Sequence, residues 1–324
     1  NLEDLYSFAQ DITKDGRDTW KIEMLGGPST EDCKYGCPDY TFQNLTEWYW
    51  PALISGVMQY SGQDKIDYIG HSLGCSVGLK SLELNHGGKI NVGYYLDSNG
   101  IWQPMNFSAN PVDTFVAVAC PGNFTKLPFF IDILNVTGPT VISQFRQQGN
   151  RHPESRDFNK RIIAYIPQTT TSNNRKDLND EYSRYKTILF FLTYVRPSSK
   201  MSLDIYEDFI NWLNNNNQPN LGKNVEIPTF LIVQAKIEGN LILDTLSPER
   251  DDKTDLFVPI EDEAQICSNV QSDNKWYVEF LGRDHGLIEK QDFQFFVRKF
   301  LGNKFIEQGK GYILNAKNNC SLIR

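Results

Sequence analysis

Long apolar runs are missing from this sequence of 324 residues. The longest candidates, 127–134 and 188–192, are much shorter than the ~20 residues that a helix needs to cross a bilayer. An excess of basic charge is missing as well, because the formal net charge is −8 at pH 7. Binding to the phosphates of nucleic acids requires a basic surface. We therefore expect no transmembrane segment and no nucleic-acid partner.

Motifs for metals and nucleotides are also missing. The 4 histidines do not cluster in the sequence, and one Cys-x-x-x-Cys pair, Cys33 and Cys37, has no second pair of ligands beside it. There is neither a phosphate-binding loop nor a Gly-x-Gly-x-x-Gly sequence. We predict no metal site and no cofactor.

The 6 cysteines are an even number, which permits complete pairing in disulfides but does not say which cysteines pair. Asn-x-Ser/Thr sequons occur five times where roughly three are expected by chance. We predict glycosylation at Asn44, Asn106, Asn123 and Asn135; the remaining sequon is at Asn319. Together these features favour a secreted protein or one in the endomembrane lumen. The alternative is an intracellular protein with free thiols and accidental sequons.

Apolar patterning indicates a mostly parallel sheet with helices on both faces. One amphipathic helix is expected over 2–12, a second over 45–57 with a boundary or kink at Pro51, and a third over 293–301 that ends at Gly302. Strands that alternate with such helices are typical of α/β proteins. The expected buried strands are Thr19–Leu25, Lys65–Ile69, Asp113–Ala119, Thr229–Ala235 and Trp276–Leu281.

The alternation stops in the middle of the chain. Residues 123–226 contain no convincing strand of the sheet, so we expect a helical cap, or lid, inserted between core segments 1–122 and 227–324. The alternative is a second packing domain that contacts no substrate.

A short glycine-containing motif predicts a serine nucleophile. The strand expected over Lys65–Ile69 runs into Gly70-His71-Ser72-Leu73-Gly74, which matches Gly-x-Ser-x-Gly between a strand and a helix. Glycines two residues on either side allow the tight turn that exposes a serine nucleophile. Ser72 is the predicted nucleophile, and the backbone N–H of Leu73 is a predicted oxyanion donor. We expect His71 to pack beside Ser72 at the substrate site.

A serine hydroxyl needs a base, and a histidine is the usual one. Only His285 follows a late strand, in Gly282-Arg283-Asp284-His285-Gly286. His86 lies in a glycine turn and His152 in a polar loop. His285 is therefore the predicted base.

The third member of a catalytic triad should be a carboxylate that follows the preceding strand, where it orients the histidine. Asp255 stands out in the turn Asp255-Leu256-Phe257-Val258-Pro259. The neighbouring acids stay open as alternatives: Glu238, Asp244, Asp251 and Asp252.

On these motifs the chain resembles the α/β-hydrolase superfamily and, within it, is similar to the secreted class 2 lipases. The resemblance is carried by 67–74, 112–119, 255–259 and 284–286, and it covers roughly 1–122 and 227–301. It implies an α/β-hydrolase fold and hydrolysis of carboxylic esters through an acyl-serine intermediate. Ser72, Asp255 and His285 match the triad positions of the family.

The chain departs from that family at its beginning. The resemblance implies three strands and an oxyanion loop ahead of the segment at Thr19–Leu25, and only the helix over 2–12 stands there. The chain also starts at Asn1 without a methionine or a signal peptide. We expect a fragment of a longer hydrolase, with an N-terminal fragment or a partner completing the sheet. A truncated relative with a structural role is the alternative.

Two classes of function follow. The first is a serine ester hydrolase, lipase-like or esterase-like, acting on a lipid or another acyl ester. The second is an inactive hydrolase-like subunit of an assembly. Peptidases, thioesterases and acyltransferases share the same triad, so the sequence does not separate them from the first. Four cap residues are candidates for an acyl pocket, although packing within the cap explains them at least as well: Phe129, Phe130, Phe190 and Phe191.

Overall fold

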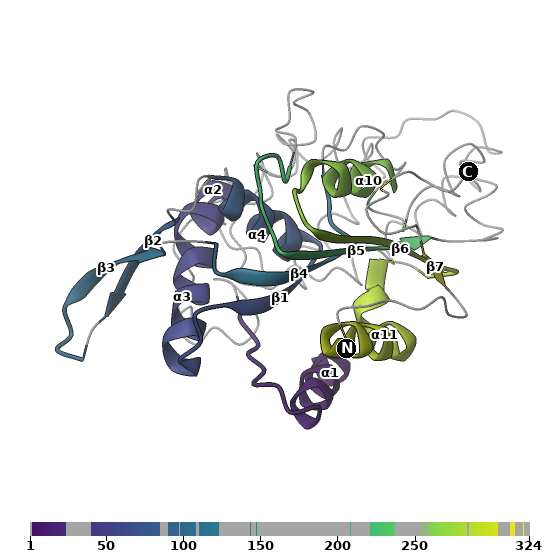
Figure 1. Ribbon diagram of the computed structural model, residues 1–324. Coiled ribbons are helices and arrows are strands. Elements are labelled where there is room, and N and C mark those ends of the chain that lie inside the picture. The colour runs from purple at the N-terminus through teal and green to yellow at the C-terminus, as the bar shows by residue number, and fades with distance from the viewer. Residues whose placement is uncertain are drawn as a thin grey trace. The chain divides into compact units, whose positions relative to one another are not determined.

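Figure 1 shows the fold of the chain in a computed structural model. The described residues are 2–23, 40–84, 90–96, 98–107, 110–122, 143, 147, 208, 221–236, 255, 258, 260–283, 285–303, 312–314 and 320.

A five-stranded sheet organises the core, in the order β1-β4-β5-β6-β7. The first four strands of that order are mutually parallel, and β7 runs antiparallel to β6. A separate two-stranded antiparallel sheet, β2-β3, forms a hairpin. The strands are β1 Ile66–His71, β2 Ile90–Leu96, β3 Trp102–Phe107, β4 Val112–Val118, β5 Thr229–Lys236, β6 Asn274–Leu281 and β7 Tyr312–Leu314.

Helices lie on both faces of the five-stranded sheet (Figure 1). In the figure α1 and α11 lie on one side of it, and α4 and α10 on the other. Helices on both faces of a mostly parallel sheet make this an α/β fold, as the sequence predicts. The helical elements are α1 Leu2–Lys14, α2 Phe42–Asn44, the π-helical η2 Leu45–Tyr49, α3 Trp50–Ser61, α4 Leu73–Leu84, α10 Ile260–Asn269, the 3-10 element η4 His285–Glu289 and α11 Gln291–Asn303.

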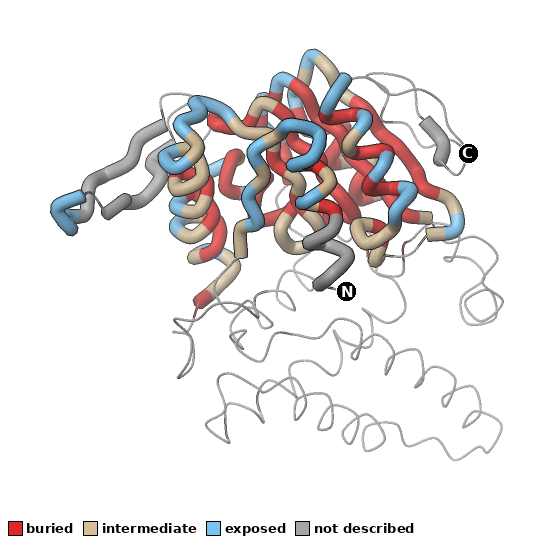
Figure 2. Tube along the Cα trace, turned by 90° about the horizontal axis from the view of Figure 1, so that it is seen from below, coloured by how far each residue is buried: buried red, intermediate tan, exposed pale blue. Residues whose placement is uncertain are grey.

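The core forms because alternate side chains of each strand point to opposite faces. On the α1 and α11 side, Val116, Leu231 and Val278 from three adjacent strands pack with Phe8 of α1 and Phe293 of α11. Figure 2 shows these strands as almost continuous buried segments. Each strand of a sheet that is covered on both faces has an almost unbroken apolar sequence, and this pattern predicts β4 and β5 as strands.

The opposite face is less apolar. There the side chains of Gln234, Tyr277 and Glu279 are fully or almost fully buried, as is Glu263 of α10. The C-terminus of α10 is satisfied by Lys275, whose ammonium donates to the carbonyls of Cys267 and Val270.

The chain divides into two compact units. One comprises 1–22, 46–128 and 216–324 and holds the five-stranded sheet; the other comprises 23–45 and 129–215. In the second unit, Thr41 caps α2 through a reciprocal bond with Asn44, and the N–H of Phe42 donates to Asp208. The cap boundaries 123–226 and the role of the cap stay predictions.

Four of the five expected strands are present as β1, β4, β5 and β6, and the helices over 2–12 and 293–301 are present as α1 and α11. The expected strand Thr19–Leu25 is wrong over 19–23, which forms neither helix nor strand. Here side chains bond locally: Thr19 donates to the carbonyl of Arg17, and the Trp20 indole donates to Asp18. Such bonds compete with pairing in a sheet.

In the part of the chain before β1 that the structure describes, 2–23 and 40–65, no strand pairs with β1. A partner strand for this edge stays a prediction. None of the helices described in the structure has the length and apolar character needed to span a membrane.

Among the described residues two disulfides are formed, Cys75–Cys120 and Cys267–Cys320, which close loops with sequence separations of 45 and 53 residues. The loops are of similar length, so chain entropy predicts a similar loss on removing either bridge, about 4 kcal/mol in the free energy of unfolding. We expect Cys75→Ala/Cys120→Ala and Cys267→Ala/Cys320→Ala to lower the denaturant midpoint comparably. A much larger loss for one pair in denaturant titrations would show that native packing, rather than loop closure, dominates at that bridge.

Candidate active site

The site begins at a sharp turn between β1 and α4. β1 ends at His71, α4 starts at Leu73, and Ser72 between them has a φ of 51°, in the left-handed region. Its backbone N–H donates to the carbonyl of Val118 at the end of β4 (2.9 Å). A left-handed residue with a side chain costs of order 1–3 kcal/mol and persists only where its surroundings hold it. Here the neighbouring strand holds the serine in place.

Glycines make this turn possible. A Cβ on Gly70 would lie 2.8 Å from the Cα of Cys75, which is backbone and therefore unable to move aside cheaply. A Cβ on Gly78, one turn further along α4, would lie 3.0 Å from the ring of Tyr68. The small residues therefore let the helix after the serine pack closely on the strand before it.

The side chain of His285 joins Ser72 to Asp255. His285 Nε2 lies 2.9 Å from Ser72 Oγ, and His285 Nδ1 lies 2.8 Å from Asp255 Oδ2. Asp255 is fully buried, and its other oxygen accepts the N–H of Val258 at 2.7 Å, which closes the Asp-x-x-Val turn. The backbone N–H of His285 also donates to the carbonyl of Asp255 (3.0 Å). The structure thus brings together the three residues predicted for the triad.

His71 lies against the same histidine. Its Nε2 is 2.8 Å from the carbonyl oxygen of His285, and the two imidazole rings are 5.0 Å apart. Burial, with a smaller effect from His285, lowers the pKa of His71 to about 4. The ring is therefore neutral near pH 7, and its Nε2–H is the donor to that carbonyl.

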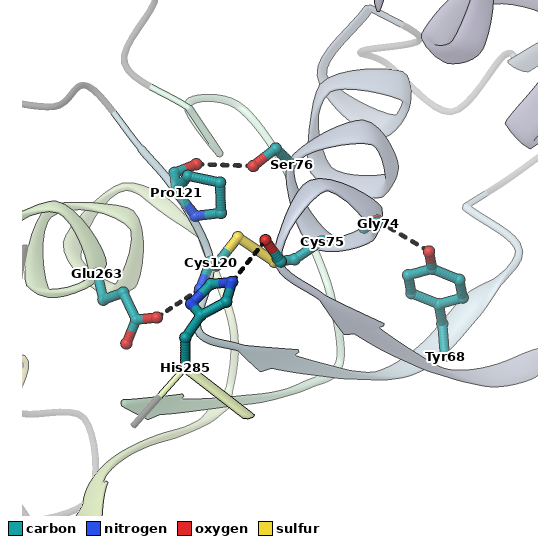
Figure 3. Close-up of a disulfide and its surroundings, with 9 residues drawn as sticks. Tyr68, Gly74, Cys75, Ser76, Cys120, Pro121, Glu263 and His285 are labelled. Carbon is teal, nitrogen blue, oxygen red and sulfur yellow. Dashed lines mark hydrogen bonds between the residues drawn. A yellow bond between two sulfur atoms is a disulfide. The ribbon is translucent and has the colours of Figure 1, made fainter. Parts of the chain in front are cut away.

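A disulfide and a buried carboxyl lie behind the turn (Figure 3). Cys75, in the first turn of α4, is bonded to Cys120, which follows β4. The backbone N–H of Cys120 donates to Glu263 Oε1 at 2.5 Å, and Ser76 Oγ donates to the carbonyl of Pro121 at 2.7 Å. These contacts fix the chain after β4 against the helix that carries the serine turn.

The parallel order of β1, β4, β5 and β6, with a serine turn after β1 and the His285 loop after β6, identifies the architecture. The chain has the α/β-hydrolase fold. No protein-family model matches the sequence. It is 30% identical over 76 residues to the gastric triacylglycerol lipases of Rattus norvegicus and Mus musculus. Each match covers 22% of this chain and 19% of the lipase, so it spans about a fifth of either protein.

Solved structures of hydrolases resemble the chain over most of its length. A monoacylglycerol lipase from Paleococcus ferrophilus aligns over 91% of this chain and 85% of its own, with 10% identity and a TM-score of 0.46. A hydrolase from Oleispira antarctica aligns over 92% of this chain and 86% of its own, with 8% identity and a TM-score of 0.48.

The remaining candidates are only partly described. As the first residue of α4, Leu73 has a backbone N–H without an acceptor inside the helix, as an oxyanion donor requires. Asn44 lies in α2 and Asn106 in β3, and their glycosylation stays a prediction. The rest lie outside the described residues: Phe129, Phe130, Phe190, Phe191, Asn123, Asn135, Asn319, and the alternative acids Glu238, Asp244, Asp251 and Asp252.

Two features of this α/β-hydrolase site were missed in the sequence. The sequence does not specify the pairing of Cys75 with Cys120, although one follows the predicted nucleophile and the other follows the next predicted strand. Glu263 stands in the acidic first turn of a helix, a position that normally faces solvent. Its burial depends on tertiary packing and has no local signal.

Gly70→Ala should destabilise the protein, because its Cβ would meet the backbone of Cys75 at 2.8 Å. Overpacking of this kind costs about 1–3 kcal/mol. Gly56→Ala is the matched control: a Cβ at Gly56 in α3 meets nothing within 4 Å. There alanine should raise stability slightly, by about 0.5–1 kcal/mol. Thermal denaturation of the two variants beside the wild type checks this, and equal effects would contradict the close approach at Gly70.

Proposed function

We propose that the protein is a serine ester hydrolase, lipase-like or esterase-like, that forms an acyl-serine intermediate. The observation that carries the proposal is the continuous hydrogen-bonded path from Ser72 through His285 to buried Asp255. A serine in a strained turn, a histidine within reach of its hydroxyl and a carboxylate on the far ring nitrogen are what acyl transfer requires.

In this mechanism Ser72 Oγ attacks the ester carbonyl while His285 Nε2 accepts the hydroxyl proton. The proton passes to the leaving alcohol. A water molecule then attacks the acyl-serine with the same histidine as base, the bond between the acyl carbon and Ser72 Oγ breaks to release the acid, and the histidine returns the proton to Ser72 Oγ. Asp255 keeps the Nδ1–H tautomer in place and stabilises the imidazolium. The N–H of Leu73 at the start of α4 is the proposed donor to the oxyanion.

The similarity to gastric triacylglycerol lipases favours a lipid or other acyl ester as the substrate class. Phe129, Phe130, Phe190 and Phe191 are proposed to line an acyl pocket in a cap formed by 123–226. The two disulfides favour a secreted or luminal location, because such bonds persist in oxidising compartments.

A fluorophosphonate probe, followed by peptide mass spectrometry, tests the proposal directly, because it reacts with an activated serine. We expect labelling at Ser72. Ser72→Ala and His285→Ala should each lower ester hydrolysis by roughly 10⁶-fold, and Asp255→Asn by about 10⁴-fold. Ser268→Ala, which removes an exposed hydroxyl on α10, should react like the wild type. A folded wild-type protein that is not labelled would contradict the enzyme and favour the inactive hydrolase-like subunit.

His71 offers a test of the hydrogen bond that orients the base. His71→Leu removes the donor to the His285 carbonyl, whereas the amide of His71→Gln has the length to replace it. One hydrogen bond is worth about 1 kcal/mol, so His71→Leu should lower kcat by about fivefold and His71→Gln by less. Because the pKa of His71 is about 4, neither variant should change the pH profile above pH 5. A displaced limb near neutral pH would contradict a neutral His71.

A further inference from the structure

Glu263 is a buried carboxyl that the mechanism above does not use. It lies in the first turn of α10, and its side chain is completely buried. Oε1 accepts the backbone N–H of Cys120, whereas no hydrogen-bond partner for Oε2 is present in the part of the chain that the structure describes. Burial of a carboxyl with an unsatisfied oxygen is costly, and far more so when it is ionised.

The contact reaches the serine turn in two further steps. Cys120 is bonded through its sulfur to Cys75, and the backbone N–H of Cys75 donates to the carbonyl of Ser72 at 2.9 Å. Figure 3 shows Glu263 on one side of this disulfide and the first turn of α4 on the other. The acid loop, which contains Asp255, directly precedes α10 in the chain. Glu263 stands in the first turn of α10, so it links this helix to α4, the helix that follows Ser72.

Among the described residues, the ionisable groups whose charge acts on Glu263 are acidic or neutral. Asp255 stands in the loop before α10, Asp262 on α10 itself, and Tyr277 and Glu279 on β6. Burial, followed by the negative charge of Asp255, raises the pKa of Glu263 well above its usual value, and the Cys120 N–H opposes this only in part. The start of a helix favours negative charge, but by less than full burial of a carboxylate disfavours it.

We propose that Glu263, in its neutral form, is a positioning residue for the reaction at Ser72. It accepts the N–H of Cys120 and so holds the disulfide-linked serine turn against α10 and the acid loop. This inference rests on the proposed hydrolase function. Ionisation would strengthen Oε1 as an acceptor but would place a second buried negative charge near Asp255, and the packing of α10 against the serine turn would loosen as water enters to solvate that charge. The rate at Ser72 should therefore fall as pH rises through the raised pKa of Glu263.

Three variants test this role on the full chain. Glu263→Gln keeps an acceptor for Cys120 and cannot ionise. Glu263→Leu is similar in size and has no acceptor. Glu279→Gln is the matched control, because it removes another largely buried carboxyl with a pKa raised by burial. In the part of the chain that the structure describes, Glu279 makes no hydrogen bond to Cys120. The measurements are kcat and KM for a short-chain p-nitrophenyl ester, and the melting temperature, each across pH.

We expect Glu263→Gln to retain kcat within about twofold and to lose the alkaline limb, whereas Glu263→Leu lowers kcat about tenfold with KM little changed. Glu279→Gln should keep the limb. An unchanged limb in Glu263→Gln, or a wild-type kcat in Glu263→Leu, would overturn the proposal. If Glu263→Leu does not fold, the profile of Glu263→Gln still decides.

The melting temperature tests the neutral state without any activity. A pKa that is higher in the folded than in the unfolded protein gives stability that is complete below the unfolded value and is lost as pH rises through the folded one. The melting temperature of Glu263→Gln should therefore increase relative to that of the wild type as pH rises. A difference that stays constant across pH would contradict a neutral Glu263 in the folded protein. Failure of the wild type to react with a fluorophosphonate would instead reject the proposed function, so the two failures are distinguishable.

Discussion

The left-handed backbone of Ser72 is the constraint that the rest of the site accommodates. The conformation exposes the hydroxyl, and it is unfavourable for any residue with a Cβ, so neighbouring elements must fix it. The bond from its N–H to Val118 uses the end of the adjacent strand, and the missing Cβ of Gly70 lets Cys75 approach. The disulfide then links the first turn of α4 to Cys120, two residues beyond Val118. The strained backbone of Ser72 thus accounts for the bond to Val118, the glycine at position 70 and the disulfide beside the turn.

Parallel pairing of β1, β4, β5 and β6 brings the other parts to the same place. The carboxyl ends of parallel strands meet at one edge, where open α/β sheets hold their sites. Ser72 follows β1, Cys120 follows β4, and His285 follows β6. Ser72 and His285, which are 213 positions apart in the sequence, therefore lie within hydrogen-bond distance. Strand pairing in the sheet brings these distant residues to the same edge, and the local turns set the exact positions of their side chains.

This division also explains what could be predicted from the sequence. Ser72, Asp255 and His285 stand in short motifs next to apolar strands, and both signals are local. The hairpin of β2 and β3, whose strands pair with each other in a separate sheet, was not predicted. The segment 19–23 resembles a strand in composition, yet Trp20 stacks on Tyr60 and bonds to Asp18 instead of joining the sheet. β-Propensity measures fit to a pleated surface, and this segment is not part of one.

Two buried carboxyls from one stretch of chain show how environment separates their roles. Asp255 has a donor at each oxygen, the N–H of Val258 and the imidazole of His285, which is what a buried carboxylate requires. Glu263 has one donor, the N–H of Cys120, and acidic neighbours, so its environment disfavours a charge. In this α/β-hydrolase fold the same chain segment would thus supply a hydrogen-bond partner for the base and a neutral support for the nucleophile.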